Sequence, residues 1–310
     1  MALERLPTIC FVLAAKDLGL YADMAAVAAL AVRRLHPQAR IILVTDEPTA
    51  CAIDHGSHAL GNIVSEIIVQ TTGTDDPIVS SRHLKTVLRQ LVKGDYLYLD
   101  NDAIAVRPLD RGWPEGANLA LARDRNLRGV PAGALPNNEK LRAKLGWEFS
   151  RNCYFNSGVI FARDTPAAHA LYIEWHRRWQ QTLSLGIWQD QPSLNRASAA
   201  GFATVAILSD RDNWATPSTA MWRGRARIFH FWASAYGSEI PTITLLGHLI
   251  ARFQQDGALD EAAIARATRD NFPWMNNVGL KHLLASGLYI RATALVPSRI
   301  IRRIRRKLSR

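Results

Sequence analysis

Cysteine is scarce in this sequence of 310 residues: only Cys10, Cys51 and Cys153 occur, far apart and without a Cys-x-x-Cys pair. Such a set supports neither a disulfide framework nor a zinc site, and it is typical of a reducing compartment. Long apolar runs are lacking too, because none approaches the roughly 18 residues that a membrane-spanning helix requires. We therefore expect a cytoplasmic protein.

Acidic side chains are in the minority, and 38 Lys and Arg against 27 Asp and Glu give a net charge of +11. Much of this excess lies in PSRIIRRIRRKLSR, residues 297–310, which contains six Arg, one Lys and no acid. Removing those seven charges leaves +4. The body of the chain is therefore not strongly basic, as a nucleic-acid-binding domain should be, and no nucleic acid partner is expected.

The basic tail has an amphipathic pattern. In a helix its arginines would fill one face and its apolar residues the other, namely Ile300, Ile301, Ile304 and Leu308. At an anionic bilayer each basic residue of such a segment contributes about 1 kcal/mol. We expect residues 298–310 to attach the protein peripherally to the inner face of the membrane. A solvated, unstructured tail is the alternative.

The rest of the chain alternates apolar strands with helices, which predicts an α/β fold whose parallel sheet is covered on both faces. The expected strands are 9–15, 39–47, 63–69, 96–99, 119–124, 155–164, 203–208 and 226–232, and the expected helices are 20–35, 80–92, 166–184, one after 190 and further ones from 242. The helix at 80–92 has a Ser at its start. We divide the chain into a core domain (1–232), a helical region (233–296) and the basic tail (297–310).

One stretch, YLYLDNDAIAVRPL, raises a chemical question, because a buried strand runs into Asp100 and Asp102 and a second apolar run follows. Parallel sheets bind ligands at the carboxyl ends of their strands, where both Asp46 and Asp100 stand. Two surface acids in a turn would be unremarkable. In a cleft, however, two close carboxylates repel each other unless a cation neutralises them. Oxygen ligands of this kind suit Mg²⁺ or Mn²⁺.

Four motifs in order resemble a known group of enzymes. After the Asp-x-Asp come FNSGV (155–159), the Asp-Gln pair of WQDQPSLN (188–195) and the late His of IFHFW (228–232). Over about residues 8–232 this order is similar to that of the GT-A nucleotide-sugar glycosyltransferases, above all glycosyltransferase family 8, the lipopolysaccharide galactosyl/glucosyltransferase and glycogenin group. The resemblance implies a Rossmann-like, mostly parallel sheet with helices on both faces and a C-terminal helical appendage.

The resemblance also implies an activity and a set of site residues. The activity is metal-dependent transfer of a sugar, with retention, from a nucleoside diphosphate sugar (a UDP-sugar favoured) to a glycan or lipid-linked acceptor. The metal, Mn²⁺ or Mg²⁺, would be held by Asp100, Asp102 and His230. The residues implied at the reacting face of the donor sugar are Asp190, Gln191 and Asp124. The donor-binding residues implied are Ala14, Lys16, Asp17, Tyr21, Arg82, Lys85, Asn101, Asn156, Ser157 and Gly158.

Alternatives remain open at several of these positions. A lone strand histidine such as His230 is more often a core residue bonded to a carbonyl, and Asp190 could cap a helix. The family's late lysine has no counterpart in HFWASAYG, so Arg223, Arg225 and Arg227 are candidates for its charge. A nucleotidyltransferase would share the sheet and the acids but usually has a glycine-rich, basic first loop, where this chain has AAKDLG. A catalytically inactive GT-A scaffold is the third possibility.

Overall fold

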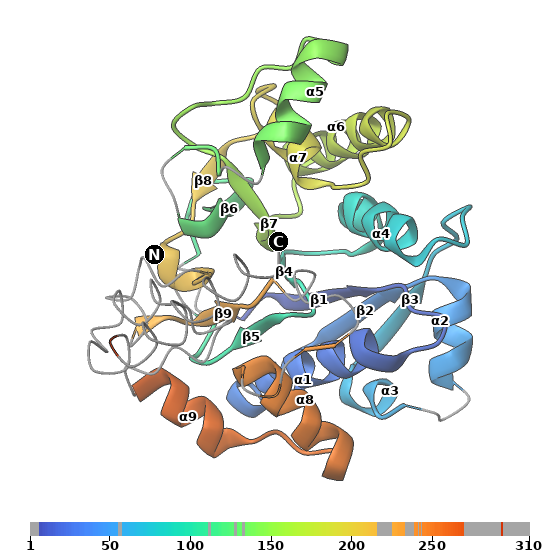
Figure 1. Cartoon of the computed structure of the whole chain (residues 1–310), viewed down its shortest axis with the longest axis vertical. Coiled ribbons are helices and arrows are strands. Elements are labelled where there is room, and N and C mark those ends of the chain that lie inside the picture. The colour runs from blue at the N-terminus through green and yellow to red at the C-terminus, as the bar shows by residue number, and fades with distance from the viewer. Residues whose placement is uncertain are drawn as a thin grey trace, which may run out of the picture.

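The central feature of the protein is a seven-stranded sheet of order β3-β2-β1-β4-β7-β6-β8, seen in a computed structural model (Figure 1). The structure describes residues 6–54, 58–110, 113–126, 129–131, 134–215, 225–232, 239–240, 242, 244–269 and 293. The strands of this sheet are β1 (Thr8–Leu13), β2 (Ile41–Thr45), β3 (Glu66–Val69), β4 (Tyr96–Leu99), β6 (Leu119–Arg123), β7 (Phe155–Ala162) and β8 (Val205–Ile207). Two further strands, β5 (Ala103–Ala105) and β9 (Ile228–His230), form a small antiparallel sheet.

Strand direction divides the large sheet into two halves. β3, β2, β1 and β4 are parallel to one another, as the alternation of strands and helices predicts. β7 runs antiparallel to both of its neighbours, β4 and β6, whereas β6 and β8 are parallel. The mostly parallel α/β sheet is therefore confirmed, with one reversed strand in its interior.

Successive strand residues point to opposite sides of this sheet. Helices cover both faces, so that each side of the sheet packs into its own apolar core. The described helices are α1 (Gly19–Leu35), α2 (Glu47–Ala52), α3 (Leu60–Ile63), α4 (Pro77–Leu91), α5 (Leu135–Leu145), α6 (Pro166–Leu183), α7 (Gln191–Ser198), α8 (Leu245–Asp256) and α9 (Glu261–Arg269). Ile9 and Phe11 of β1 belong to one apolar core with α1, α8, α9 and the β5–β9 sheet. Cys10 and Val12 belong to the other core, with α4, α6 and α7.

Several predicted boundaries need correction. α4 begins at Pro77 rather than near Ser80, because the carboxylate of Asp76 accepts the backbone N–H groups of Ile78 and Val79 and Pro at the first turn favours the start. The predicted strand 63–69 is wrong at its start, since Ile63 ends helix α3 and β3 begins at Glu66. The short helices α2 and α3, and the polar helix α5, were not predicted.

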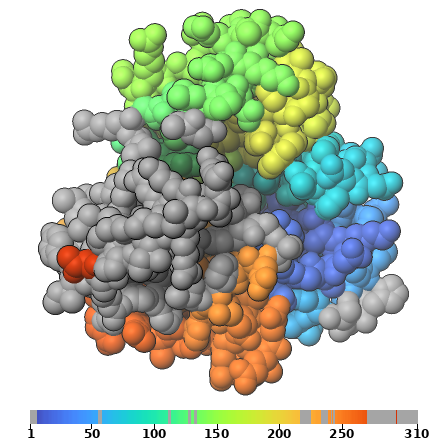
Figure 2. Space-filling model, viewed as in Figure 1, coloured from blue at the N-terminus to red at the C-terminus, as the bar shows by residue number. Residues whose placement is uncertain are grey.

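The described C-terminal helices pack onto the N-terminal part of the chain. α8 packs against α1 and places Leu245, Leu249 and Phe253 in the same core as Val27 of α1. Figure 2 shows α8, in orange, directly beside the blue N-terminal elements. Among the described residues, none of the helices combines the length and apolarity needed to span a membrane. The predicted membrane-attaching segment, residues 298–310, lies outside the described residues.

Candidate active site

The candidate site lies where β4 and β6 end and β7 begins. Because β7 is reversed, its first residues lie beside the carboxyl ends of both neighbouring strands. The backbone N–H of Asp100 donates to the carbonyl of Gly158 at 2.7 Å, and the N–H of Asp124 donates to the carbonyl of Tyr154 at 2.7 Å. The reversal thus brings the Asp-x-Asp and FNSGV motifs together, although they are far apart in the sequence.

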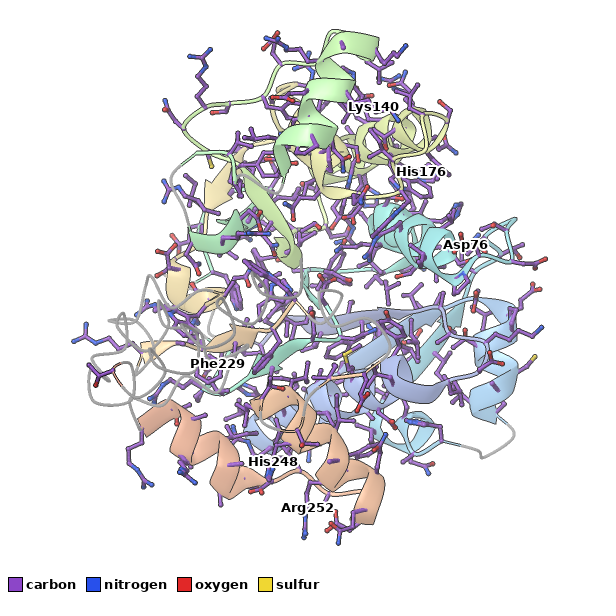
Figure 3. The ribbon with its side chains drawn as sticks, viewed as in Figure 1. Asp76, Lys140, His176, Phe229, His248 and Arg252 are labelled. Atoms are coloured by element: carbon purple, nitrogen blue, oxygen red, sulfur yellow. The ribbon has the colours of Figure 1, made fainter. Side chains whose placement is uncertain are left out.

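Three potential metal ligands converge at this edge. Asp100, Asp102 and His230 each offer a ligand atom, and these atoms all lie within 4.8 Å of one another. Nε2 of His230 is 3.3 Å from Oδ1 of Asp102 and 3.8 Å from Oδ2 of Asp100. The acids lie in the turn between β4 and β5, and His230 is brought to them because it pairs with Ala103 across the β5–β9 sheet. Figure 3 labels its neighbour Phe229 on β9.

The orientation of His230 suits a ligand. Its Nδ1 lies 2.9 Å from Oδ1 of Asn213, which leaves Nε2 directed at the two acids. A core histidine bonded only to a carbonyl would not face two carboxylates. Burial acts to lower the pKa of His230, but the charges of Asp102 and Asp100 outweigh burial, so that this pKa is raised above its ordinary value.

The absence of a side chain at Gly158 lets Asp100 and His230 pack closely against the backbone of β7. A Cβ atom built on it would lie 2.3 Å from Cε1 of His230 and 2.5 Å from Oδ2 of Asp100. Both distances are far below any normal contact, so a side chain at this position would displace both groups. The protein's own side chains therefore approach this glycine closely.

Lys85 of α4 holds the other oxygen of the first acid. Its Nζ donates to Oδ1 of Asp100 at 2.9 Å and to Oγ of Ser157 at 3.2 Å, and its side chain is only 2% exposed. The hydroxyl of Tyr98 donates to the same Oδ1 at 2.5 Å. The protein's own donors therefore occupy Oδ1, and Oδ2 faces His230 and lies against Gly158.

Electrostatics keep Asp100 charged. Burial acts to raise the pKa of Asp100, and the charge of Asp102 adds to this. The positive charges of Lys85, His230 and Arg82 outweigh both, so the pKa of Asp100 lies below its ordinary value. A carboxylate that stays ionised can act as a metal ligand over a wide range of pH.

Asp190 does not cap helix α7, although it occupies the residue before the helix. Its side chain makes no capping hydrogen bond. Instead, Oδ1 lies 3.2 Å from Nε of Arg82 and Oδ2 lies 3.6 Å from Nζ of Lys85. Burial acts to lower the pKa of Arg82, but Asp190 and Asp100 outweigh it and raise this pKa. The capping alternative is thus wrong, and Asp190 instead pairs with the two cations of α4.

Asn156 is the centre of a second polar cluster. Its Nδ2 donates to Oδ1 of Asp124 at 3.1 Å and to Oε1 of Gln191 at 3.2 Å. Its Oδ1 accepts from the backbone N–H of Gly158 at 2.9 Å and from Nδ2 of Asn213 at 2.9 Å. Burial raises the pKa of Asp124 despite these hydrogen bonds. The structure therefore brings together Asp124, Asn156 and Gln191, as the motifs predict.

The expected base-binding loop follows β1 at the same edge of the sheet, since β1 and β4 are parallel neighbours. Ala14 is buried, whereas Lys16, Asp17 and Tyr21 are exposed, Tyr21 by 47%. Asn101 ties the acidic turn to this strand, because its Nδ2 donates to the carbonyl of Val12 at 3.0 Å. These positions remain predictions as donor contacts.

The arginines considered as a substitute for the family's lysine do not reach this cluster in the described residues. The Nε of Arg227 donates to Oδ1 of Asp212 at 2.5 Å, and its guanidinium stacks 5.1 Å from the ring of Trp113. Arg225 is exposed, and Arg223 lies outside the described residues. Lys85 contacts the first acid of the Asp-x-Asp motif.

Asn213 and Tyr98 contribute to the site but were missed from the sequence. Tyr98 is an apolar-looking member of the strand YLYL, and only the fold shows that its hydroxyl reaches Asp100. Asn213 follows β8, a parallel strand whose carboxyl end lies at the same edge as that of β6. The polar run after this predicted strand, Asp210 to Asn213, was the available signal.

The residues present fit a hard divalent cation. Two carboxylates and a neutral imidazole nitrogen are the oxygen and nitrogen ligands that Mn²⁺ accepts, and Mg²⁺ is compatible with the carboxylates. Lys85 and Arg82 pair with Asp100 and Asp190, and Asp102 adds a third carboxylate to this cluster, so these three acids outnumber the two cations. A divalent cation would reduce this imbalance.

The arrangement of the sheet, with acids where β4 ends, defines the chain as a protein of the GT-A fold. It is similar to the galactosyltransferase LgtC, crystallised with donor and acceptor sugar analogues, with 18% identity, coverage of 82% of this chain and 96% of that chain, and a TM-score of 0.51. It is also similar to apo GlyE, a glycosyltransferase of Streptococcus pneumoniae TIGR4, with 14% identity, coverage of 84% and 62%, and a TM-score of 0.50. No protein-family profile and no curated protein matches the sequence.

Proposed function

We propose that this protein is a metal-dependent glycosyltransferase that moves a sugar from a nucleoside diphosphate sugar, with a UDP-sugar favoured, to a glycan or a lipid-linked saccharide. The observation that carries the proposal is the convergence of Asp100, Asp102 and His230 at the ligand-binding edge of a GT-A sheet. The crystal structure of LgtC with donor and acceptor sugar analogues, on the same fold, supports the class of substrate.

Each part of the site has a role in this reaction. Mn²⁺ or Mg²⁺ bound by Asp100, Asp102 and His230 would stabilise the negative charge of the departing diphosphate. Lys85 and Arg82 hold Asp100 and Asp190 in place and add fixed positive charge beside the leaving group. The amides of Asn156 and Gln191 present polar groups suited to sugar hydroxyls.

Retention of the anomeric configuration is the stereochemistry that we propose. An inverting enzyme needs a carboxylate that is free to take a proton from the acceptor. Asp190 is buried and pairs with Arg82, and Asp124 is buried and accepts from Asn156. Neither acid is placed as a free base, which favours transfer of the acceptor's proton to the departing diphosphate itself.

The residues that would contact the nucleotide and the donor sugar are proposed from the sequence. Ala14, Lys16, Asp17 and Tyr21 would surround the base, and Asn101 and Ser157 would lie near the ribose and the donor sugar. A membrane-attached tail would place a lipid-linked acceptor within reach, and peripheral attachment at the cytoplasmic face of a membrane is part of the proposal.

The direct test is a thermal-shift comparison of nucleoside diphosphates with and without Mn²⁺, on the intact protein and two variants. UDP should stabilise the wild-type protein only together with Mn²⁺, and Asp102→Asn should abolish this gain by removing a metal ligand. Asp46→Asn is the matched control, because Asp46 directly follows β2, a parallel strand of the same sheet, but its side chain caps helix α2. It should keep the full metal-dependent gain.

The outcomes separate the alternatives. Stabilisation by UDP without metal, or an unchanged gain in Asp102→Asn, would contradict the metal-dependent mechanism. A nucleotidyltransferase would instead consume a nucleoside triphosphate and release pyrophosphate. An inactive scaffold would bind the diphosphate with Mn²⁺ but release no UDP from any UDP-sugar.

A further inference from the structure

The starting point is the buried side chain of Asn213, which touches two parts of the site at once. Its Oδ1 lies 2.9 Å from Nδ1 of His230 and its Nδ2 lies 2.9 Å from Oδ1 of Asn156. Asn213 is 1% exposed, and both of its partners are buried. Water therefore does not compete for these contacts, and the direction of each hydrogen bond must be set by the protein.

The backbone sets that direction at Asn156. The N–H of Gly158 can only donate, so the atom of Asn156 that it meets at 2.9 Å must be the amide oxygen. The opposite atom of that amide, Nδ2, then faces acceptors, the carboxylate of Asp124 and Oε1 of Gln191. Gln191 is oriented in the same way, because its Oε1 accepts from the backbone N–H of Ser157 at 3.4 Å.

The direction of the hydrogen bond at Asn156 determines the direction of the one at His230, because Asn213 bonds to both residues. Since Asn156 presents its oxygen, Asn213 must meet it with Nδ2, and the oxygen of Asn213 must face the imidazole. An oxygen can only accept, so Nδ1 of His230 must carry a hydrogen. In the neutral ring the lone pair then belongs to Nε2, which is the nitrogen directed at Asp102 and Asp100.

We propose that Asn213 is a positioning residue that selects the metal-ligating tautomer of His230 and couples it to the sugar-binding amide of Asn156. This inference deepens the proposed function and rests on it. The other end of Asn213 is also held, because its carbonyl accepts from Nδ2 of Asn126 at 2.9 Å. Asn126, whose φ is +54°, also accepts from the N–H of Ala215 at 2.9 Å. The residue is therefore fixed by both its backbone and its side chain.

Two substitutions separate hydrogen bonding from packing. Asn213→Leu keeps the approximate volume but removes the acceptor for Nδ1, and it should weaken binding of Mn²⁺ alone by about 10- to 100-fold, the range for partners that orient a metal ligand. Asn213→Asp keeps an acceptor for Nδ1, and it should bind Mn²⁺ within about threefold of wild type, while losing the donor to Asn156. Isothermal titration of the intact protein with Mn²⁺ measures both.

A matched control and a second readout complete the experiment. Asn118→Leu removes another amide that makes side-chain hydrogen bonds, to Thr165 and Thr204, away from the site, and it should leave Mn²⁺ binding unchanged. In protein labelled with ¹⁵N-histidine, without metal and at a pH high enough to keep the ring of His230 neutral, the Nδ1 resonance lost in His230→Gln should report a protonated Nδ1 in the wild type. The same resonance should show no fixed proton in Asn213→Leu.

Results that contradict the role of Asn213 differ from results that contradict the proposed function. Wild-type Mn²⁺ affinity in Asn213→Leu, equal weakening in Asn213→Leu and Asn213→Asp, or an unprotonated Nδ1 in the wild type would each overturn the inference. If Asp102→Asn binds Mn²⁺ as tightly as the wild type, the proposed function fails instead. The ¹⁵N resonances of the metal-free protein then still decide whether Asn213 sets the tautomer.

Discussion

The two halves of the central sheet use the polar residues at their strand ends differently. In the parallel half, Asp46 accepts the N–H of Thr49 at 3.2 Å to cap helix α2, and the hydroxyl of Thr45 donates to the carbonyl of Leu13 at 2.7 Å. In the half that contains the reversed strand, Asn156 and Asp124 bond to each other across adjacent strands. The strand-end groups of β2 thus stabilise the local structure, whereas those of β4, β6 and β7 converge on the candidate site.

The contrast between Asp46 and Asp100 shows what makes a site. Both acids directly follow a buried parallel strand, and both looked like candidates in the sequence. Asp100 differs because β7 begins beside it, and the absence of a side chain at Gly158 lets Asp100 and His230 approach each other. A strand-end acid acquires chemistry only where a neighbouring strand provides partners and space.

The largest effect on Mn²⁺ binding should come from adding a side chain at Gly158. Gly158→Ala would place a methyl group 2.3 Å from Cε1 of His230 and 2.5 Å from Oδ2 of Asp100. We expect Mn²⁺ affinity to fall at least about tenfold, measured by isothermal titration, because both ligands must move. The free energy of unfolding, measured in urea, should fall by about 1–3 kcal/mol.

The control for this change is another glycine in the parallel half. Gly61→Ala in helix α3 would place its Cβ 3.1 Å from Cγ2 of Ile53, which is the end of a side chain. Mn²⁺ binding should be unaffected there. Unchanged binding in Gly158→Ala as well would remove the distinction between the two halves.

The next effect concerns the cation that links the halves. Lys85→Met leaves the carboxylate of Asp100 without its closest positive partner, and we expect the free energy of unfolding to fall by about 3 kcal/mol. Saturating Mn²⁺ should restore more stability to this variant than to the wild type, because the added charge replaces the lost one. Lys93→Met, at an exposed position, is the control and should change little. Equal stabilisation of all three proteins by Mn²⁺ would contradict this role of Lys85.

The smallest effect on Mn²⁺ binding is expected at the interface between α4 and α6, away from the metal ligands. His176 of α6, labelled in Figure 3, has its Nδ1 2.8 Å from Oγ1 of Thr86 of α4. Burial, and to a lesser degree the charge of His83, lowers the pKa of His176 from 6.5 to about 4. The unfolded chain therefore binds a proton as the pH falls below 6.5, whereas the folded protein binds it only near 4.

Stability from His176 is thus fully present above pH 6.5 and is lost as the pH falls towards about 4. The slope should not exceed about 1.4 kcal/mol per pH unit. Urea titrations across this range should show a shallower decline for His176→Gln, which cannot titrate. Mn²⁺ binding should be the same in both proteins. The same slope in wild type and variant would show that another group is responsible.

The parallel half of the sheet was predictable because its signals are local. Each strand there is a short apolar run between helices, and the Asp-x-Asp motif directly follows one of them. The order of the motifs also indicated the GT-A fold and brought Asp124, Asn156 and Gln191 into one site. Which of these residues come into contact depends on the direction of β7, and an apolar run in the sequence does not reveal that direction.

The unpredicted parts depend on contacts between distant segments. Asn213 meets His230 only because β8 ends at the same edge as β6, and no spacing in the sequence encodes this distance. The role of Asp190 also depended on tertiary structure, since its position before a helix suggested a cap while α4 supplied two cations. Local rules therefore singled out Asp190 but left open whether its side chain would cap the helix or contact groups of the candidate site.

The reversed strand has a consequence for how the protein acquires its activity. The groups around Gly158 come from β4, β7, the segment after β8 and β9, so the ligand cluster is incomplete until the chain has folded nearly to residue 230. A nascent or truncated chain that ends before β9 would hold the two acids without the imidazole. Under the proposed function, manganese uptake therefore reports completed assembly of this domain.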